Sequence, residues 1–351
     1  MSITKKFVTY LILFIIICFA IPILFTKKFE EIEVSSNLEN QNNNQENEGN
    51  KQENKQVEVS EIVSTYNYKE YATIKLLHVK TNQVEEIKLD DYLYGVVSSE
   101  MPANFEEEAL KAQAVVARTY TIYKIQNNLG KHGEASICDD STCCQAWISK
   151  EDRFARWQEE TREANWNKIT KSVNLTQGKI ITYEGKPINA FFHSNSGGKT
   201  ETTANVWGGT GYPYLQSIET AGEDAYTQYN SEAKFTRNDL INKIKGKHAD
   251  FQINFDEPEC IKILEYTEGN RVKTVKIGNL QLSGVEVRTI LGLRSANFDI
   301  TINGDEITFT VKGYGHGVGM SQTGADSMAK SGSNYEEIIK HFYSGVEIEY
   351  L

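Results

Sequence analysis

The sequence predicts an α+β protein, because strand-like and helix-like segments both occur along the chain without an internal repeat. Residues 71–79 and 84–89 alternate apolar and polar side chains on either side of a turn at 81–83, which is typical of a β-hairpin. Residues 105–129 carry apolar side chains at helical spacing, with acidic residues in the first turn and Gly130 after the end. We therefore expect a sheet and a long helix to share one domain.

The same patterns predict the remaining elements. We expect strands at 179–183, 190–193, 272–277 and 305–311, and helices at 236–244 and 334–341. Residues 93–97 form an apolar, strand-like run directly before the sequence SSEMP at 98–102. The segment from about 221 to 300 is rich in charged turns, and we interpret it as a second lobe that flanks a central cleft.

Composition excludes several classes of protein. The chain has 351 residues with 37 Lys and Arg against 48 Asp and Glu, a formal net charge of -11 and only 5 Cys. These numbers rule out a collagen, a coiled coil, a disulfide-dense mini-protein and a polytopic membrane protein. The acidic balance, with no basic run after the first thirty residues, argues against nucleic acid as a partner.

The N-terminal region predicts a membrane-anchored protein. Residues 7–26 are uncharged, mostly apolar and long enough to cross a bilayer as a helix, and a pair of lysines flanks each end. No small-residue cleavage pattern follows, so we expect an uncleaved single-pass anchor after a cytoplasmic tail at 1–6. Residues 27–67 are dominated by Asn, Gln, Glu and Ser, which predicts a disordered tether. The domain at 68–351 would then lie outside the cytoplasm, close to the membrane.

Several motifs occur in a fixed order along this domain. They are SSEMP at 98–102, ALKAQAVVARTYT at 109–121, FFHSNSGGKTE at 191–201, VWGG at 206–209, PYL at 213–215 and GYGHGVGMSQTGA at 313–325. Together they resemble the SpoIID/LytB domain family over 68–351. The resemblance implies a two-lobed lytic transglycosylase that cuts peptidoglycan glycan strands stripped of their stem peptides, leaving 1,6-anhydromuramyl ends.

The resemblance also implies a cellular setting and partners. Such a protein acts in sporulation during engulfment of the forespore, anchored in the mother-cell membrane with its catalytic domain facing the intermembrane space. Its implied partners are the glycan strands and the stage II sporulation proteins P and M, of which P is the amidase that strips the strands.

Glu100 is the candidate catalytic residue. Cleavage of a glycosidic bond needs an acid that protonates the leaving oxygen, and a carboxyl group stays protonated near neutral pH only where its surroundings are partly desolvated. Glu100 lies between an apolar run and Met101-Pro102, which suits such a site. A hydrolase would need a second carboxylate, whereas a lytic transglycosylase uses the 6-hydroxyl of muramic acid as its nucleophile. Alternatively, Glu100 is a surface residue that flanks the next helix.

Three segments supply candidate substrate-binding residues. The resemblance implies that the helix carrying Arg118 and Tyr120 lines the cleft, although Arg118 would equally suit a helix surface. The polar loop beside the glycine pair at 197–198 and the glycine-dense segment at 313–325 offer hydrogen-bonding and aromatic groups for a sugar. From these segments we select His193, Ser194, Ser196, Thr200, Tyr314 and His316. Alternatively, the glycine pair at 197–198 forms an ordinary turn and His193 is a core histidine. The segment at 313–325 could likewise be a packing motif at the start of a helix.

A cluster of metal-ligand residues occurs in HGEASICDDSTCCQAW, which contains His132, Cys138, Cys143 and Cys144. Thiolates and an imidazole can form a tetrahedral zinc shell, but an extracytoplasmic domain can also form a disulfide. The clostridial members of the family that the chain resembles imply His132, Cys138 and Cys144 as ligands of one structural zinc ion. The fourth ligand stays open.

The sequence leaves three alternative functions open. One is a glycan hydrolase and another is a noncatalytic glycan-binding scaffold. The third is a zinc amidase that acts on stem peptides, although the H-E-x-x-H signature of many zinc peptidases is absent.

Overall fold

A computed structural model describes residues 67–127 and 132–351 of the chain. The predicted cytoplasmic tail, the anchor at 7–26 and all but the last residue of the tether at 27–67 lie outside the described residues. Within the described part of the chain, no helix is both long enough and apolar enough to cross a membrane.

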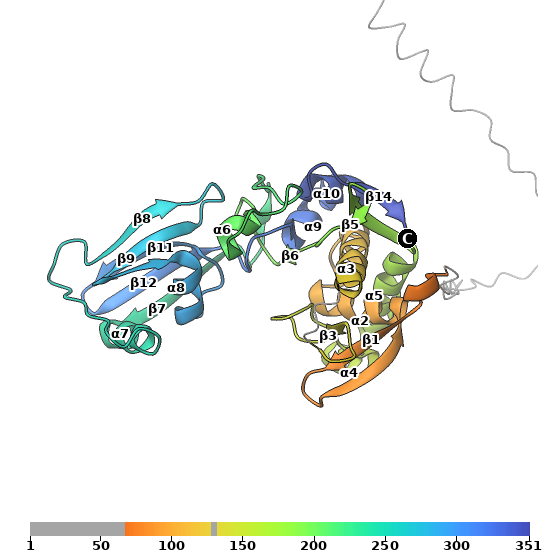
Figure 1. Ribbon diagram of the computed structural model, residues 1–351, viewed down its shortest axis with the longest axis horizontal. Helices are drawn as coiled ribbons and strands as arrows, with labels where there is room; N and C mark the ends of the chain where they lie inside the picture. Colours follow the sequence, from red (N-terminus) through yellow and green to blue (C-terminus); the bar gives the residue numbers. More distant parts are fainter. Residues whose placement is uncertain (1–66, 128–131) are drawn as a thin grey trace, which may run out of the picture. The chain divides into compact units, whose positions relative to one another are not determined.

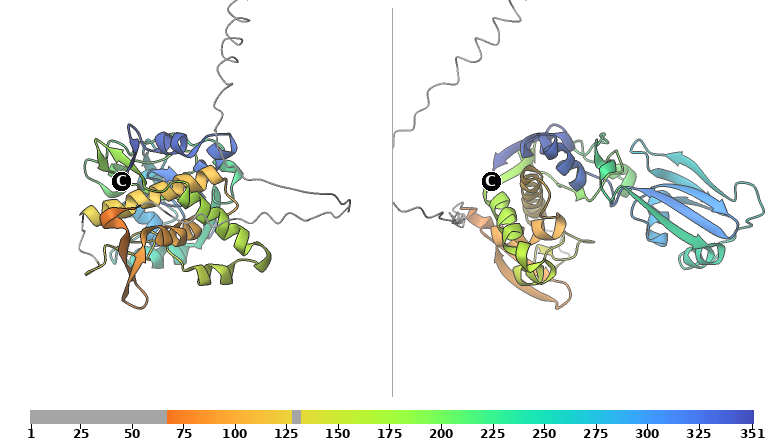
Figure 2. Two further views of the ribbon diagram at one scale, coloured as in Figure 1. Left: turned by 90° about the vertical axis from the view of Figure 1, so that its right-hand side faces the viewer. Right: turned by 180° about the vertical axis from the view of Figure 1, so that it is seen from behind.

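The described residues form a mixed α+β structure with several small sheets and two hydrophobic cores. The first core belongs to helices α2 (Leu89–Glu100), α3 (Glu107–Asn127), α5 (Glu159–Asn174), α9 (Gln322–Lys330) and α10 (Tyr335–Phe342), together with three small sheets. Helix α3 contacts each of the other four, and Figure 1 shows it at the centre of this part. Turned by 90°, the same part shows α3 (yellow) running above α2 (orange) and α5 (green) (Figure 2). The predicted long helix is therefore the scaffold of the first core.

The small sheets of the first core pack against these helices. Strand β1 (Thr73–His78) pairs with β2 (Gln83–Lys88) and with β3 (Ile137–Cys138), which confirms the predicted hairpin. Strand β4 (Lys179–Tyr183) lies between β14 (Glu347–Tyr350) and β5 (Lys186–Pro187). The shortest sheet joins β6 (Phe192–His193) in parallel to β13 (Met320–Ser321), and so brings two distant sequence motifs side by side. Two short helices, α4 (Lys150–Arg156) and α6 (Thr203–Trp207), and two 3-10 turns, Lys69–Tyr71 and Glu223–Ala225, complete this part.

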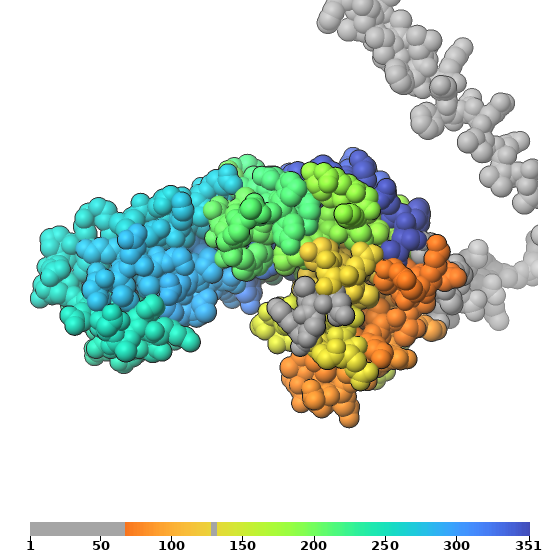
Figure 3. All heavy atoms as spheres, viewed as in Figure 1, coloured from red at the N-terminus to blue at the C-terminus, as the bar shows by residue number. Residues whose placement is uncertain are grey.

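The second core lies in the segment that the sequence assigned to a second lobe. Its residues run from Ala233 to Val311, so it extends beyond the expected end near residue 300. One antiparallel sheet holds β8 (Ile261–Tyr266), β9 (Val272–Ile277) and β10 (Leu280–Ser283), and another holds β7 (Asn230–Thr236), β11 (Asn297–Asn303) and β12 (Glu306–Lys312). Helices α7 (Arg237–Lys245) and α8 (Gly284–Leu291) pack with these strands, and Figure 3 shows their atoms (teal to blue) closely packed.

The predicted strand at 93–97 is wrong, because these residues lie inside helix α2. The buried apolar positions are Leu89, Tyr92, Leu93, Val96 and Val97, a spacing that fits one face of a helix rather than a strand. The strand-like run predicted from the sequence began at residue 93, so it did not include Leu89 and Tyr92, which form the first turn of this helical pattern. The helix ends at Glu100 because the residue before a proline avoids the helical conformation, and Met101 is extended (φ -119°, ψ 141°) before Pro102.

Candidate active site

Glu100 occupies the last residue of α2, at the point where a buried helix reaches a cavity. Its Oε1 accepts a hydrogen bond of 2.7 Å from the backbone N–H of Ala146, and its Oε2 accepts one of 3.4 Å from Nε2 of Gln322. Burial raises the pKa of the Glu100 carboxyl group, although both hydrogen bonds favour the charged form and act in the opposite direction. The surroundings of Glu100 therefore favour a carboxylic acid that keeps its proton above the usual pH range.

Two cavities meet at Glu100. One has a volume of about 430 Å³ and the other about 480 Å³. Glu100, Ser194 and Gln322 line both of them. Among the described residues that line these two cavities, Glu100 is the only one with a carboxyl group. A third cavity, of about 620 Å³, continues from the first and shares Pro102, Asn104, Phe105 and Gln228 with it. The three cavities form a series along the surface, with Glu100 at one of the junctions.

Aromatic side chains line the cavity of about 480 Å³. Trp207 at the end of α6 and Tyr314 keep 52% and 45% of their surface exposed, which is unusual for residues of this size. The His316 ring lies 5.1 Å from the Trp207 ring, and Phe191 and Tyr120 continue the same wall. Exposed aromatic faces in a cavity suit the apolar faces of sugar rings, with polar atoms left at the rim.

The two histidines of this cavity are held neutral. Burial, and secondarily the Arg271 guanidinium, lowers the pKa of His193 to about 3. The His193 Nδ1 atom lies 3.1 Å from the carbonyl oxygen of Val318, so Nδ1–H is the donor and Nε2 is left as an acceptor. Burial also lowers the pKa of His316 well below its ordinary value, with the His193 ring as a smaller cause. The Nε2 atom of His193 is buried and has no hydrogen-bond partner among the described residues.

A glycine allows the two histidines to approach each other. Gly315 has a φ of +120°, which side-chain-bearing residues rarely adopt, and a Cβ atom there would lie 2.8 Å from Cβ of His193. The glycine-dense sequence at 313–319 therefore has a structural purpose at this site, since it lets the backbone beside Tyr314 and His316 pass close to the loop that follows β6.

Glu223 organises the loop that the sequence assigned to sugar binding, although sequence reasoning missed this residue. It is 1% exposed and accepts hydrogen bonds from the backbone N–H groups of Ser196 and Gly198. Its other donors are the hydroxyl groups of Ser196, Thr220, Ser321 and Thr323. Burial alone would raise the pKa of Glu223, but these hydrogen bonds outweigh burial and lower the pKa. Among the hydrogen bonds, the one from the Ser196 hydroxyl contributes most. The polar side chain of Ser196 thus points to a buried carboxylate.

Three predicted substrate-binding residues are not among those that line the cavities around Glu100. Ser196 is fully buried against Glu223, and Thr200 is 1% exposed with its hydroxyl donating to the carbonyl oxygen of Gln216. Arg118 is fully buried, where it donates to the carbonyl oxygens of Val173, Thr176 and Lys179. Since Val173 lies in the last turn of α5 and Thr176 and Lys179 follow its end, Arg118 fastens that helix end to α3. Tyr120, His193, Ser194, Tyr314 and His316 do line the cavities.

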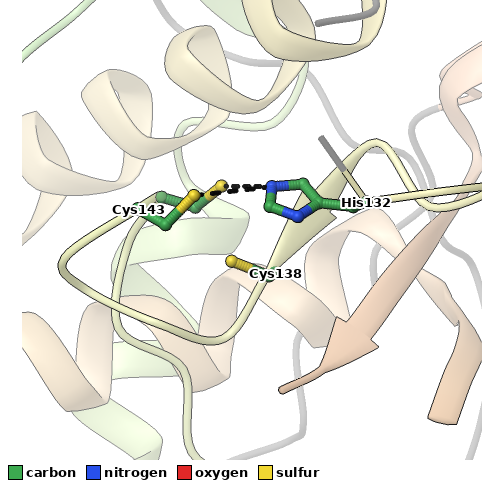
Figure 4. A group of neighbouring side chains, drawn as sticks. His132, Cys138 and Cys143 are labelled. Atoms are coloured by element: carbon green, nitrogen blue, oxygen red, sulfur yellow. Dashed lines mark hydrogen bonds between the residues drawn. The ribbon is translucent and has the colours of Figure 1, made fainter. Parts of the chain in front are cut away.

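A cluster of one histidine and three cysteines borders the same cavity. The ligand atoms of His132, Cys138, Cys143 and Cys144 all lie within 4.8 Å of one another. Nε2 of His132 is 3.7 Å from Sγ of Cys143 and 3.4 Å from Sγ of Cys144, and Figure 4 shows these side chains pointing toward one another. All three cysteines are free thiols. The sequence named His132, Cys138 and Cys144, and the structure brings Cys143 to them as a fourth donor.

The cluster fits a tetrahedral metal ion of the zinc type. Zinc bonds of about 2.3 Å to sulfur and about 2.0–2.1 Å to nitrogen, at a tetrahedral angle, separate a sulfur from a nitrogen by about 3.6 Å. The two sulfur-to-nitrogen distances, 3.4 and 3.7 Å, lie on either side of this value. A complete set of four protein donors is typical of a structural site rather than a catalytic one.

The cysteine segment is fastened to Glu100. Directly after Cys144, the side chain of Gln145 donates from Nε2 to the hydroxyl groups of Tyr92 on α2 and Thr121 on α3, both over 2.9 Å. The next residue is Ala146, whose N–H binds Glu100. The segment that holds the cluster therefore also positions the candidate catalytic carboxyl group.

Sequence reasoning missed several residues of the site. Gln322 and Trp207 lie within the motifs quoted above, but nothing in the sequence pattern indicated that Gln322 contacts Glu100 or that Trp207 lines the cavity of about 480 Å³. Arg153 and Trp157 belong to the region of α4, for which the sequence predicted no element at all. Only their positions in the fold identify them.

Comparison with known proteins agrees with the motifs. The family described as SpoIID, stage II sporulation protein, matches residues 78–183. Stage II sporulation protein D of Bacillus amyloliquefaciens is 38% identical over 277 residues, which cover 79% of this chain and 78% of the relative. Stage II sporulation protein D of Bacillus subtilis is 38% identical over 278 residues, which cover 79% of this chain and 78% of the relative. The amidase enhancer of Bacillus subtilis is 29% identical over 306 residues, which cover 73% of this chain and 40% of the relative. The chain therefore belongs to the SpoIID family of stage II sporulation proteins.

Proposed function

We propose that this protein is a peptidoglycan lytic transglycosylase whose general acid and base is Glu100. The observation that carries the proposal is the single, partly buried carboxyl group at the junction of two cavities. A glycan strand that fills both cavities would place one of its glycosidic bonds at Glu100. The aromatic side chains of Trp207 and Tyr314 support the same substrate class, because they offer stacking surfaces to sugar rings.

The chemistry follows from a single carboxyl group. The Glu100 carboxylic acid donates its proton to the glycosidic oxygen as the bond from that oxygen to the anomeric carbon of muramic acid breaks. The resulting carboxylate then takes the proton of the muramic 6-hydroxyl while that oxygen bonds to the same anomeric carbon. The product is a 1,6-anhydro ring, and Glu100 regains its proton. A hydrolase would need a second carboxylate to serve as nucleophile or to activate water.

We propose that one zinc ion is held by His132, Cys138, Cys143 and Cys144 and has a structural function. When bound, a zinc ion supplies a fixed crosslink among four side chains of the segment that leads to Ala146. The residues of the chain carry out the reaction, with Ala146 orienting Glu100. A zinc amidase is less well supported, because four protein donors leave no open position for a substrate.

The cellular setting is proposed on the family and on the N-terminal sequence. We propose that residues 7–26 anchor the protein in the mother-cell membrane and that the tether places the catalytic domain in the space around the forespore. There it would act on strands from which an amidase, stage II sporulation protein P, has removed the stem peptides, together with stage II sporulation protein M.

Product analysis tests the function. The soluble domain, from about residue 57, is incubated with peptide-free glycan strands, with Glu100→Gln in parallel, and the products are analysed by mass spectrometry. We expect ends that are one water lighter than hydrolysed ends, formed by the parent domain and absent from the variant. Hydrolysed ends would instead indicate a glycan hydrolase, freed peptides from intact wall an amidase, and retention on wall without products a glycan-binding scaffold.

A further inference from the structure

The cavity of about 430 Å³ beside Glu100 contains an arginine that has no use in the reaction described above. Arg153 lies on α4, which begins after Ser149, whose hydroxyl accepts a hydrogen bond from the N–H of Asp152. Its side chain lines this cavity together with Glu100, Trp157 and Gln228. The helix was not expected from the sequence, so no motif pointed to this residue.

The Arg153 guanidinium has no anionic partner within the described part of the chain. Its Nε atom is buried without a hydrogen-bond partner, and no described carboxylate lies within ion-pair distance of the group. The guanidinium lies over the ring of Trp157, whose centroid is 4.7 Å from Cζ. Burial, and secondarily the charge of Arg156, lowers the pKa of Arg153, but an arginine remains protonated at neutral pH. A partly buried cation without a counter-charge is costly, and a bound anion would remove that cost.

The other groups of this cavity do not supply the missing charge. Asn104, Asn165 and Gln228 carry neutral amides. Glu100 must be protonated to act as the acid, so it is not a permanent counter-ion for Arg153. The cavity therefore offers one cation, several neutral polar groups and an aromatic ring, which suits a sugar that carries one negative charge.

We propose that Arg153 binds the lactyl carboxylate of a muramic acid residue and thereby selects strands whose stem peptides have been removed. This inference rests on the proposed function. In a stripped strand, each muramic acid carries a free lactyl carboxylate, which a guanidinium can bind through two parallel hydrogen bonds. In a strand that keeps its peptides, the same carbon belongs to a neutral amide, which offers no charge and continues into a peptide chain.

The second cavity is the weaker candidate for this charge recognition. It contains Arg288 of α8, but the Nε atom of Arg288 already donates to the carbonyl oxygen of Leu293 over 3.4 Å. The remaining large side chains of that cavity are the aromatic residues described above, which suit the faces of uncharged sugar rings. Because the Nε atom of Arg153 has no partner whereas that of Arg288 has one, Arg153 is the better candidate for the carboxylate position.

Binding to an inactive protein tests the inference without depending on catalysis. Peptide-free glycan fragments, the same fragments with their lactyl carboxylates methyl-esterified, and peptide-bearing fragments are titrated calorimetrically into the soluble domain carrying Glu100→Gln. We expect the free acid to bind about 10- to 100-fold more tightly than the ester, because hydrogen bonds to a charged group are stronger than those to a neutral one. Equal affinity for acid and ester would overturn the proposal.

Substitution then assigns the effect to Arg153. Adding Arg153→Gln should weaken binding of the free acid about 10- to 100-fold and leave binding of the ester within about twofold, and Arg153→Lys should retain part of the preference. The matched control is Arg156→Gln, which removes the same charge from an exposed position of α4 outside the cavity and should change neither affinity. Equal weakening for acid and ester, or a similar loss with peptide-bearing fragments, would refute charge recognition of the lactyl group.

The two proposals can fail separately. Cleavage by the parent domain is measured on its own, so a domain that binds the free acid through Arg153 but cuts nothing would overturn the transglycosylase assignment alone. A domain that cuts strands but binds acid and ester equally would overturn only the role of Arg153.

Discussion

The side chain of Gln322 donates a hydrogen bond from Nε2 to Oε2 of Glu100 over 3.4 Å, although 222 residues separate the two in sequence. Gln322 begins α9, directly after β13, and β13 pairs with β6, which contains His193. The glycine-dense segment, the loop after β6 and the end of α2 therefore converge on one carboxyl group. Both donors to Glu100 stabilise its charged form while burial stabilises the neutral form, and burial prevails.

The pH profile of turnover should reflect the raised pKa of Glu100. A general acid works only while it is protonated, so kcat/KM on peptide-free strands should fall as the pH rises through that pKa. Because the pKa is raised, this fall should occur above the ordinary range of a glutamate, which is about 4.3. Initial rates measured from pH 4 to 9 in buffers of constant ionic strength test this. A fall centred near pH 4 would contradict the assignment of Glu100 as the acid.

Removal of the Gln322 amide should move that profile further. The Gln322 hydrogen bond lowers the pKa of Glu100, so Gln322→Ala should shift the alkaline limb of kcat/KM to higher pH. We also expect a lower maximum rate, since Glu100 would lose one of its two orienting contacts. Gln228→Ala is the control for the shift, because Gln228 lines the same cavity but makes no hydrogen bond to Glu100. If the alkaline limb of the kcat/KM profile stays at the same pH in Gln322→Ala, the Gln322 amide does not bind the Glu100 carboxylate in solution.

Local pattern predicted several elements with an apolar face, but it missed α5 and α8 although both bury apolar residues. The hairpin, α3, β4, β9 and α10 were found with small errors at their ends. Helix α2 was missed because the strand-like run at 93–97 contains only three of its five buried apolar positions, and α4 was missed because none of its residues is buried. A helix that presents no apolar face gives no periodic signal.

The site was predictable only in part, since sequence motifs indicate which residues gather but not which way they point. Tyr120, two positions after Arg118 on α3, lines a cavity, whereas Arg118 is enclosed by backbone carbonyls. Likewise Ser194 lines both cavities, but Ser196, two positions later, binds Glu223. The partners that decide these directions come from segments far away in the sequence, which local patterns do not specify.

Glu223→Gln should destabilise the domain by about 2–4 kcal/mol at pH 7, since a buried carboxylate that accepts several hydrogen bonds is replaced by an amide that accepts fewer. The pKa of Glu223 is lower in the folded protein than in the unfolded chain. The Glu223 carboxylate therefore stabilises the fold at pH values above the unfolded pKa of about 4.3, and this stabilisation is lost as the pH falls through the folded pKa. The difference between parent and variant should therefore shrink on acidification. Urea denaturation at a series of pH values measures it.

The nearby Glu219 provides the control for this prediction. Its exposed carboxylate forms an ion pair of 3.3 Å with Lys199, and surface pairs of this kind contribute less than about 1 kcal/mol. Glu219→Gln should leave the urea midpoint almost unchanged. Equal effects of the two substitutions would mean that the buried hydrogen bonds of Glu223 add no stability.

Cys143→Ser should separate a four-residue metal site from the three-residue set predicted from the sequence. With Cys143 as a ligand, the variant should bind zinc more than about tenfold more weakly, since substitutions even beyond the direct ligands cost 10- to 100-fold. Competition with a chromophoric chelator measures the affinity, and Cys260→Ser, which removes a buried free thiol outside the cluster, is the control. If the zinc affinity of Cys143→Ser is unchanged, Cys143 is not a ligand and the predicted set of His132, Cys138 and Cys144 stands. Because Ala146 follows the cluster and binds Glu100, loss of the metal should also lower kcat, and added zinc should restore it.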